Sequence, residues 1–224
     1  MINGRSLVMV SLMAITAFVS LSGCFKNLPV KNEVYFNDFE GGSDRNLSVY
    51  DHNGKVDTLK IVTFNNNKVF GFFNNNRFDL LVENLPEHNA IKIEFDLLIH
   101  DKWDGDYLIP GSSVPDAWQM QLEGRPIYIT TFSNGTYGQS YPYNHVAGYT
   151  PNPARANAWN PNLPGVCALK SQPNGSSLYK IEYTTAHTAP TVSLACNDAL
   201  QPYLSYCLKS WSVDNLRVTA INYK

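Results

Sequence analysis

The sequence predicts an all-β protein built as a two-layer antiparallel β-sandwich. Short β-rich segments recur between clusters of Asn, Gly and Pro, residues 91–96 alternate between apolar and polar side chains, and no long helical period follows the first segment. Of the 224 residues 44% are hydrophobic and 12% aromatic, enough to bury a core and to exclude wholesale disorder. About 200 residues follow the first segment without a linker, which favours one sandwich domain.

Ten segments of the chain have strand character. Residues 90–99 are the clearest, with Ile91, Ile93 and Phe95 on one face and Lys92 and Glu94 on the other. Asn triplets at 65–67 and 74–76 predict hairpin turns, because Asn tolerates the left-handed conformation. Residues 153–159, after Asn152, allow one or two helical turns. The expected strands are 34–40, 58–64, 69–73, 78–82, 90–99, 118–122, 127–132, 178–184, 191–195 and 211–221.

The first segment is a targeting signal. Arg5 precedes an apolar run over 7–21 that is too short for a comfortable membrane span, and the run ends in Leu21-Ser22-Gly23-Cys24. This tetrapeptide resembles the bacterial lipobox, in which the Cys is lipidated and the chain is cut before it. The resemblance implies a signal peptide over 1–23 and lipid on Cys24. We expect a lipidated tether over 24–33, since 25–33 is a short polar segment, and one β-sandwich domain over 34–224. The alternative is an ordinary secretory signal with an accidental Cys.

These boundaries bear on partners and location. Lipid at Cys24 makes the membrane a partner and places the protein in a bacterial cell envelope, at the outer membrane or the cell surface. Without the leader, which holds Arg5 and no acid, the chain has 16 basic and 19 acidic residues, a formal charge of −3. With no Lys/Arg cluster, nucleic acid is not an expected partner.

A series of motifs resembles a family of secreted bacterial β-sandwich domains. The resemblance covers about residues 34–222 and implies a concanavalin-like or jelly-roll fold of the kind that often binds carbohydrate. Ser212 stands where the pattern usually has Gly, and 196–207 is an insertion. The motifs are WDG at 103–105, PDAW at 115–118, FSN at 132–134, QSYP at 139–142, a His at 187 and SWSVDN at 210–215.

The resemblance also implies a metal site. In many jelly-roll carbohydrate-binding modules an acid on the first strand and an Asp on the last share a structural Ca²⁺. Glu40 and Asp214 hold these positions here, and first and last strands are commonly neighbours in such folds. The alternative is that Asp214 binds the neighbouring turn. A second acidic group consists of Asp101, Asp104, Asp106 and Asp116. Carboxylates are hard oxygen ligands and suit Ca²⁺. The alternative is that these residues form a plain Asp-Gly turn.

Three Cys remain after Cys24, and an exported chain meets oxidising conditions. We expect two of them to pair. Cys196–Cys207 is favoured because its loop is short, although pairings of Cys167 with Cys196 or with Cys207 stay open.

The long segment 133–177 is the main candidate for ligand binding. Between Pro126 and Leu169 its only formally charged side chain is Arg155, and it is rich in Tyr, Asn, Pro and Gly. Aromatic rings with amides and few charges suit neutral sugars. We expect a glycan site formed by Trp159, Tyr143, Tyr149 and, if the loops converge, Trp103. The alternative is that these Tyr fold inward and only fix the loop.

Catalysis has weaker support in the sequence. Glu94 and Asp96 resemble the start of the Glu-x-Asp-x-x-Glu set of lectin-fold glycanases, but Ile99 stands at the third position, so a solvated strand face is expected. We therefore name no catalytic residue. The expected function is non-catalytic binding of a glycan or surface polymer. The alternatives are a structural or adhesive envelope protein without a small ligand and, third, a glycan-active enzyme.

Overall fold

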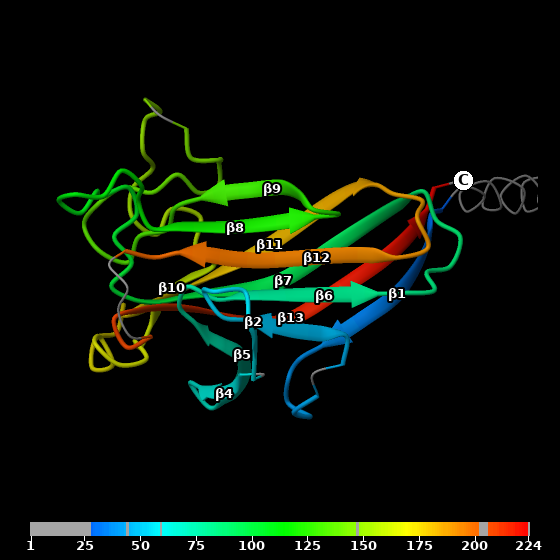
Figure 1. The fold of residues 1–224 in the computed structure, drawn as a ribbon, viewed down its shortest axis with the longest axis horizontal. Coiled ribbons are helices and arrows are strands. Elements are labelled where there is room, and N and C mark those ends of the chain that lie inside the picture. The colour runs from blue at the N-terminus through cyan, green and yellow to red at the C-terminus, as the bar shows by residue number, and fades with distance from the viewer. Residues whose placement is uncertain (1–27, 44, 59, 147, 202–205, 224) are drawn as a thin grey trace, which may run out of the picture.

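The computed structural model describes residues 28–43, 45–58, 60–146, 148–201 and 206–223. They form two antiparallel sheets, as predicted (Figure 1). Sheet A has seven strands in the order β10-β11-β7-β13-β5-β4, with β1 also paired to β13, and sheet B has the order β3-β2-β6-β12-β8-β9. The bounds are β1 Val30–Asn37, β2 Leu47–Tyr50, β3 Val56–Asp57, β4 Ile61–Phe64, β5 Asn67–Phe73, β6 Arg77–Val82, β7 Ala90–Asp101, β8 Ala117–Leu122, β9 Arg125–Thr130, β10 Asn160–Leu163, β11 Ser176–Ala186, β12 Val192–Ala199 and β13 Lys209–Asn222.

The first and last strands are neighbours. β1 pairs with the second half of β13, from Val30 opposite Asn222 to Asn37 opposite Leu216. The strand therefore starts at Val30, four residues before the expected start of the first strand at 34. The signal peptide and Cys24 lie outside the described residues. Within the described ranges, no helix is long and apolar enough to cross the membrane.

The two Asn triplets behave differently. Asn65 and Asn66 have positive φ angles of 49° and 66° and close the β4–β5 hairpin, as predicted. The second triplet, 74–76, is also a turn, but it connects β5 in sheet A to β6 in sheet B. The prediction of a second hairpin is wrong because the apolar sides of β5 and β6 face each other across the core.

Three short strands were not predicted from the sequence. β2, β3 and β10 have two to four residues each, too few to show a period. Residues 153–159 form turns and no helix, and the Asn152 amide donates to the carbonyl oxygens of Ser140 and Tyr141, 3.2 and 3.0 Å away, so it does not cap a helix.

The core between the sheets is strongly aromatic. Trp211 lies 4.7 Å from Phe73 and 6.0 Å from Trp118, measured between ring centroids. A second, smaller apolar cluster lies on the other side of sheet A, around Phe64, Val69 and Leu98, where Leu163, Val166 and Leu178 pack against it. Sheet A is thus apolar on both faces over part of its width.

Candidate functional site

The outer face of sheet B carries a polar hollow of about 530 Å³. It lies over four neighbouring strands, β2, β6, β12 and β8, on the layer nearer the viewer in Figure 1. The apolar residues of these strands point into the core, so the alternate residues point outward and are polar. The side chains that line the hollow include Tyr50, His52, Arg77, Asp79, Gln121 and Asn197.

Strand register places these side chains in two rows. One row runs from Tyr50 through Arg77 and Asn197 to Gln119, each opposite the next on the neighbouring strand. The parallel row holds Asp79, Ala195 and Gln121 in the same way. Ala195 is the shortest side chain among them, so the floor is lowest between Asp79 and Gln121.

The one ion pair in the rows is internal to a strand. The Arg77 guanidinium donates from Nε to Asp79 Oδ1 at 2.5 Å and from a terminal nitrogen to Oδ2 at 3.1 Å. Both side chains are partly exposed, and the fork fixes them side by side. An ion pair beside amides offers donors and acceptors together, the mixture that hydroxyl groups require.

One rim of the hollow is held from below by a buried carboxylate. Asp198 accepts the backbone N–H groups of Asn75 and Asn76 at 2.6 and 3.2 Å and the Trp211 indole N–H at 2.7 Å. Burial raises the pKa of Asp198 to about 6, although these three donors lower it. The second Asn triplet is therefore tied to the core at the edge of the hollow.

Trp103 is not part of the protein surface. It is fully buried, and its indole N–H donates to the Ser210 carbonyl oxygen at 2.8 Å. The prediction that Trp103 contributes to a glycan site is wrong, because the loop after β7 turns the ring into the core. Gly105 shows how closely this loop is packed, since a Cβ there would lie 2.0 Å from the Gly138 carbonyl oxygen.

The other three predicted aromatics lie apart in the long loop. Tyr149 is half-buried and donates its hydroxyl to Asp106, and burial together with this carboxylate raises its pKa. Tyr143 is 68% exposed beside β9, where its carbonyl oxygen accepts from Thr130. Trp159 is 74% exposed, but its backbone N–H bonds to Leu178 in sheet A. Within the described part of the chain no hydrogen bond or ring contact joins these three.

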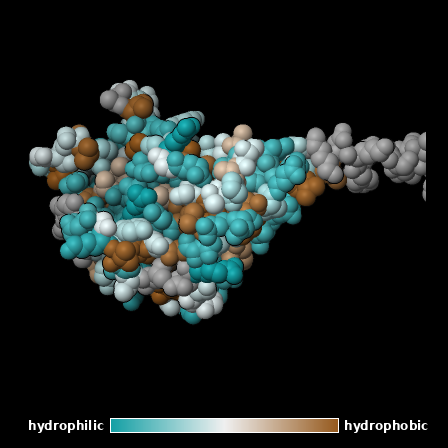
Figure 2. All heavy atoms as spheres, turned by 45° about the vertical axis from the view of Figure 1, so that its right-hand side comes forward, coloured by the Kyte–Doolittle hydropathy of each residue, from teal (hydrophilic) through white to brown (hydrophobic). Residues whose placement is uncertain are grey.

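Figure 2 shows a largely hydrophilic face, with hydrophobic side chains in small patches, several on the projecting loops. The loops lie at the end of the sandwich opposite to the chain ends (Figure 1). Tyr107 and Tyr137 stack there at 4.4 Å between ring centroids.

A lysine occupies the centre of the second acidic group. Lys209 Nζ lies 2.6 Å from Asp116 Oδ2 and 2.8 Å from Asp104 Oδ2, and it is 2.9 Å from the Gln201 carbonyl oxygen. The ammonium group thus stands where a cation would neutralise these carboxylates. Asp106 is engaged separately by Thr131 at 2.6 Å. Among the described residues no three His, Cys, Asp or Glu side chains are arranged to hold a metal ion.

Glu40 and Asp214, the first metal candidate, bind different neighbours. Asp214 accepts from the Asn67 amide at 2.7 Å, and Glu40 accepts the backbone N–H of Lys68 at 2.7 Å. Burial raises the pKa of Asp214 to about 6, and the charges of Asp96, Glu40 and Asp38 raise it further. Both acids therefore approach β5, and Ca²⁺ at this position stays a prediction.

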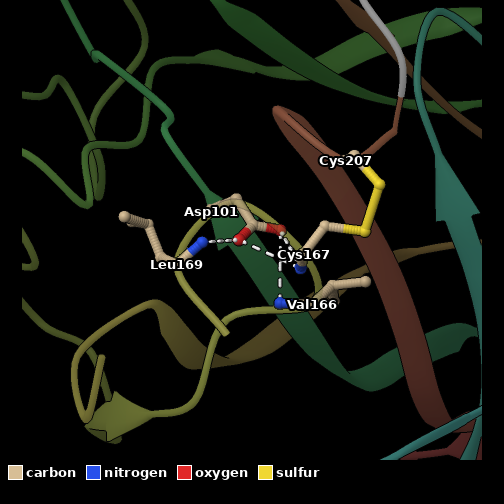
Figure 3. The surroundings of a disulfide bond; sticks show 5 residues. All are labelled: Asp101, Val166, Cys167, Leu169 and Cys207. Atoms are coloured by element: carbon tan, nitrogen blue, oxygen red, sulfur yellow. Dashed lines mark hydrogen bonds between the residues drawn. A yellow bond between two sulfur atoms is a disulfide. The ribbon is translucent and has the colours of Figure 1, made fainter. Parts of the chain in front are cut away.

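The disulfide joins Cys167 to Cys207 (Figure 3). The prediction of Cys196–Cys207 is wrong. Cys196 lies on the inward side of β12, together with Leu194 and Asp198. It is a free thiol and is fully buried. Cys207 precedes β13 and meets the long loop instead.

Asp101 holds the same loop from the end of β7 (Figure 3). Its carboxylate accepts the backbone N–H groups of Leu169, Val166 and Cys167 at 2.8, 3.2 and 3.3 Å. Burial nevertheless raises the pKa of Asp101, against these donors. The carboxylate and the disulfide together fix the segment 163–175, here called the strap, over the outer side of sheet A.

Acidic and histidine side chains of β7 that could serve catalysis are otherwise engaged. Glu94 and Asp96 pair with Lys92 and Lys180 at 2.7 and 2.6 Å. His100 lies between the hydroxyls of Ser176 and Ser212 at 2.9 and 2.6 Å, but all three are fully buried. Burial lowers the pKa of His100 to about 3, so it is neutral.

No protein-family model and no curated protein matches this chain. Solved structures with similar folds include dimeric latent PorU from Porphyromonas gingivalis, at 8% identity and TM-score 0.37 over 66% of this chain and 10% of that one. A family 35 carbohydrate binding module from Clostridium thermocellum is 9% identical, with TM-score 0.37, over 85% and 97% of the two chains. The C-terminal CBM6 of LamC from Zobellia galactanivorans is 12% identical, with TM-score 0.33, over 86% and 99%. Likenesses at these TM-scores assign no function to this chain.

Proposed function

We propose that this protein binds carbohydrate without catalysis, in the hollow on sheet B. The observation that carries the proposal is the pair of polar rows. Tyr50 supplies a ring face, Asn197 and Gln121 supply amides, and Arg77 with Asp79 supplies fixed charges of both signs. Sugars present apolar ring faces and many hydroxyls, and sites that bind them combine apolar contact with a few placed polar groups.

A glycan array followed by calorimetry tests this function. Tyr50→Ala and Asn197→Ala should each abolish or strongly weaken binding of a glycan found on the array. The matched control is Thr184→Ala, an exposed residue of β11 in the other sheet. The long loop is the competing site: if Trp159→Ala and Tyr143→Ala lose binding while the two hollow variants keep it, the ligand lies on the loop.

The second candidate function is a structural or adhesive role in the envelope without a small ligand. The exposed apolar residues Leu108, Val114 and Val146 on the projecting loops favour it. If wild type binds no glycan at millimolar concentration, this function replaces the first. A glycan-active enzyme is the third candidate, and hydrolysis of any array hit would support it.

We further propose that Cys24 carries lipid and holds the sandwich at a bacterial envelope membrane. The support is the Leu21-Ser22-Gly23-Cys24 sequence behind a short apolar leader. Cys24→Ala should release the protein from the membrane fraction and end palmitate labelling. Unchanged labelling of the variant would contradict the anchor.

A further inference from the structure

A polar row crosses four strands on the outer face of sheet B, and Gln119 extends it past the residues that line the hollow. Tyr50, Arg77, Asn197 and Gln119 lie one per strand on β2, β6, β12 and β8. Neighbouring strands are about 4.8 Å apart, so the row spans about 14 Å from its first strand to its last. This distance exceeds the length of one pyranose ring, and polar groups continue to both ends of the row.

The second row runs in the same direction. Ala195 lies between Asp79 and Gln121 in the second row, opposite each of them. Ala195 is 4% exposed and does not line the hollow, so a ligand that follows the row would contact its longer neighbours and not Ala195 itself.

The charges around the hollow disfavour an anion. Two carboxylates face it, those of Asp51 and Asp79, and the buried carboxylate of Asp198 lies beneath its rim. The Arg77 guanidinium is already forked onto Asp79, and two of its five N–H donors are used there. An acidic sugar would bring a further negative charge to a surface whose one guanidinium is neutralised, whereas a neutral sugar needs only the donors and acceptors present.

From this register we infer that the hollow binds an internal stretch of an uncharged polysaccharide, about three units long, laid across β2, β6, β12 and β8. The inference rests on the proposed function and specifies its ligand. A single terminal sugar would contact only one part of the row. A chain of three units would contact Tyr50, the Arg77–Asp79 fork and Asn197 with Gln119 at the same time.

The test uses the purified protein and ladders of one to six units from β-1,4-glucan, β-1,3-glucan, β-1,4-xylan and β-1,4-mannan, with oligogalacturonates as the acidic set. For the ladder that binds, affinity should rise at least about tenfold from one unit to three and then level off. Oligogalacturonates should bind more weakly than the neutral chains.

Variants at the two ends of the row sharpen the test. Tyr50→Ala and Gln119→Ala should each weaken binding of the three-unit ligand, while a monosaccharide should respond to at most one of them. Thr184→Ala on sheet A should change neither. The single-unit ligand therefore reports where on the row a sugar lies, and the longer ligand reports whether the whole row is used.

The possible failures are distinguishable. If one unit binds as tightly as six, or if oligogalacturonate binds best, the proposed function stands and the inference is overturned. If a neutral ladder binds but neither end variant weakens its three-unit member, the inference is also overturned. If no ladder binds and the glycan array is blank, the proposed function fails and the inference fails with it.

Discussion

The outer faces of the two sheets differ in whether another segment of the chain covers them. On sheet A, the strap over 163–175, fixed by the disulfide and by Asp101, packs on the outward-facing Leu98 and its neighbours. On sheet B, the corresponding outward positions hold Arg77, Asp79, Asn197 and Gln121, with no second apolar cluster among the described residues. One face is covered by the protein itself and the other is left for solvent or a ligand.

This difference shows what outward-facing residues indicate in a sandwich. Leu98 is covered by the same chain, which avoids the cost of exposing it to water, whereas Leu81 on the outer side of β6 is 48% exposed. A row of polar outward residues indicates a face that buries no apolar surface when the protein folds. The predictions below test this contrast from the largest effect on stability to the smallest.

Loss of the disulfide should have the largest effect. It closes a separation of 40 residues, and in the chain-entropy model such a cross-link contributes about 4 kcal/mol. Cys207→Ser should lower the free energy of unfolding by this order in urea titrations. Non-reducing peptide mapping should find Cys167 linked to Cys207 and Cys196 free. A Cys196–Cys207 peptide would contradict the structure.

Removing the covered leucine should have the next largest effect. Leu98 is 5% exposed beneath the strap, so Leu98→Ala should cost about 3 kcal/mol, within the usual range for a buried leucine. Gln121→Ala, an outward position on sheet B, should change the free energy of unfolding by less than about 0.5 kcal/mol. Equal costs in urea titrations would remove the contrast between the faces.

The two faces should contribute similarly to pH dependence. Asp198 behind the hollow and Asp214 on sheet A both have a pKa of about 6, above the ordinary 3.8. The folded protein therefore holds these protons more tightly than the unfolded chain, and stability should rise as pH falls from about 7 towards 4. Each group should contribute on the order of 2 kcal/mol to this rise.

Urea titrations at several pH values measure this slope. Asp198→Asn and Asp214→Asn should each flatten it, whatever their effect on absolute stability. A slope unchanged in both variants would show that these two carboxyls do not cause the pH dependence.

Loss of the fork in the hollow should also have only a small effect on stability. The Arg77–Asp79 pair is partly exposed, and such pairs contribute about 0–1 kcal/mol. Arg77→Gln should therefore unfold at nearly the wild-type denaturant concentration and yet lose affinity for the glycan. A variant that loses stability and retains binding would reverse the roles given to the two faces.

The fold followed from the sequence where alternation was long enough to read. Residues 91–96 alternate cleanly, and β7 covers them. β2, β3 and β10 are too short to show alternation. The turn at 74–76 was predictable, but whether it joins strands of one sheet or crosses between sheets depends on contacts distant in sequence.

The candidate site was harder to predict, because its residues come from strands far apart in the chain. Tyr50 and Asn197 are 147 positions apart and belong to one row only through the strand order β2-β6-β12. The available signal was the polar half of each alternating strand, such as Gln119 and Gln121 around the apolar Met120. The emphasis on aromatic residues instead led to Tyr143, Tyr149 and Trp159 in the long loop and to Trp103 after β7, which the fold buries.

The pairing of β1 with β13 also determines how the domain transmits force. Val30 lies opposite Asn222, and the hollow lies towards the other end of the sandwich, where β6 starts and β12 ends (Figure 1). Tension between a ligand in the hollow and the amino-terminal end of β1 pulls that strand along its own length. The hydrogen bonds of the β1–β13 ladder are perpendicular to the strands, so they are loaded together in shear and do not open one at a time. With the proposed anchor and a bound polymer, the domain would therefore be loaded along this strand.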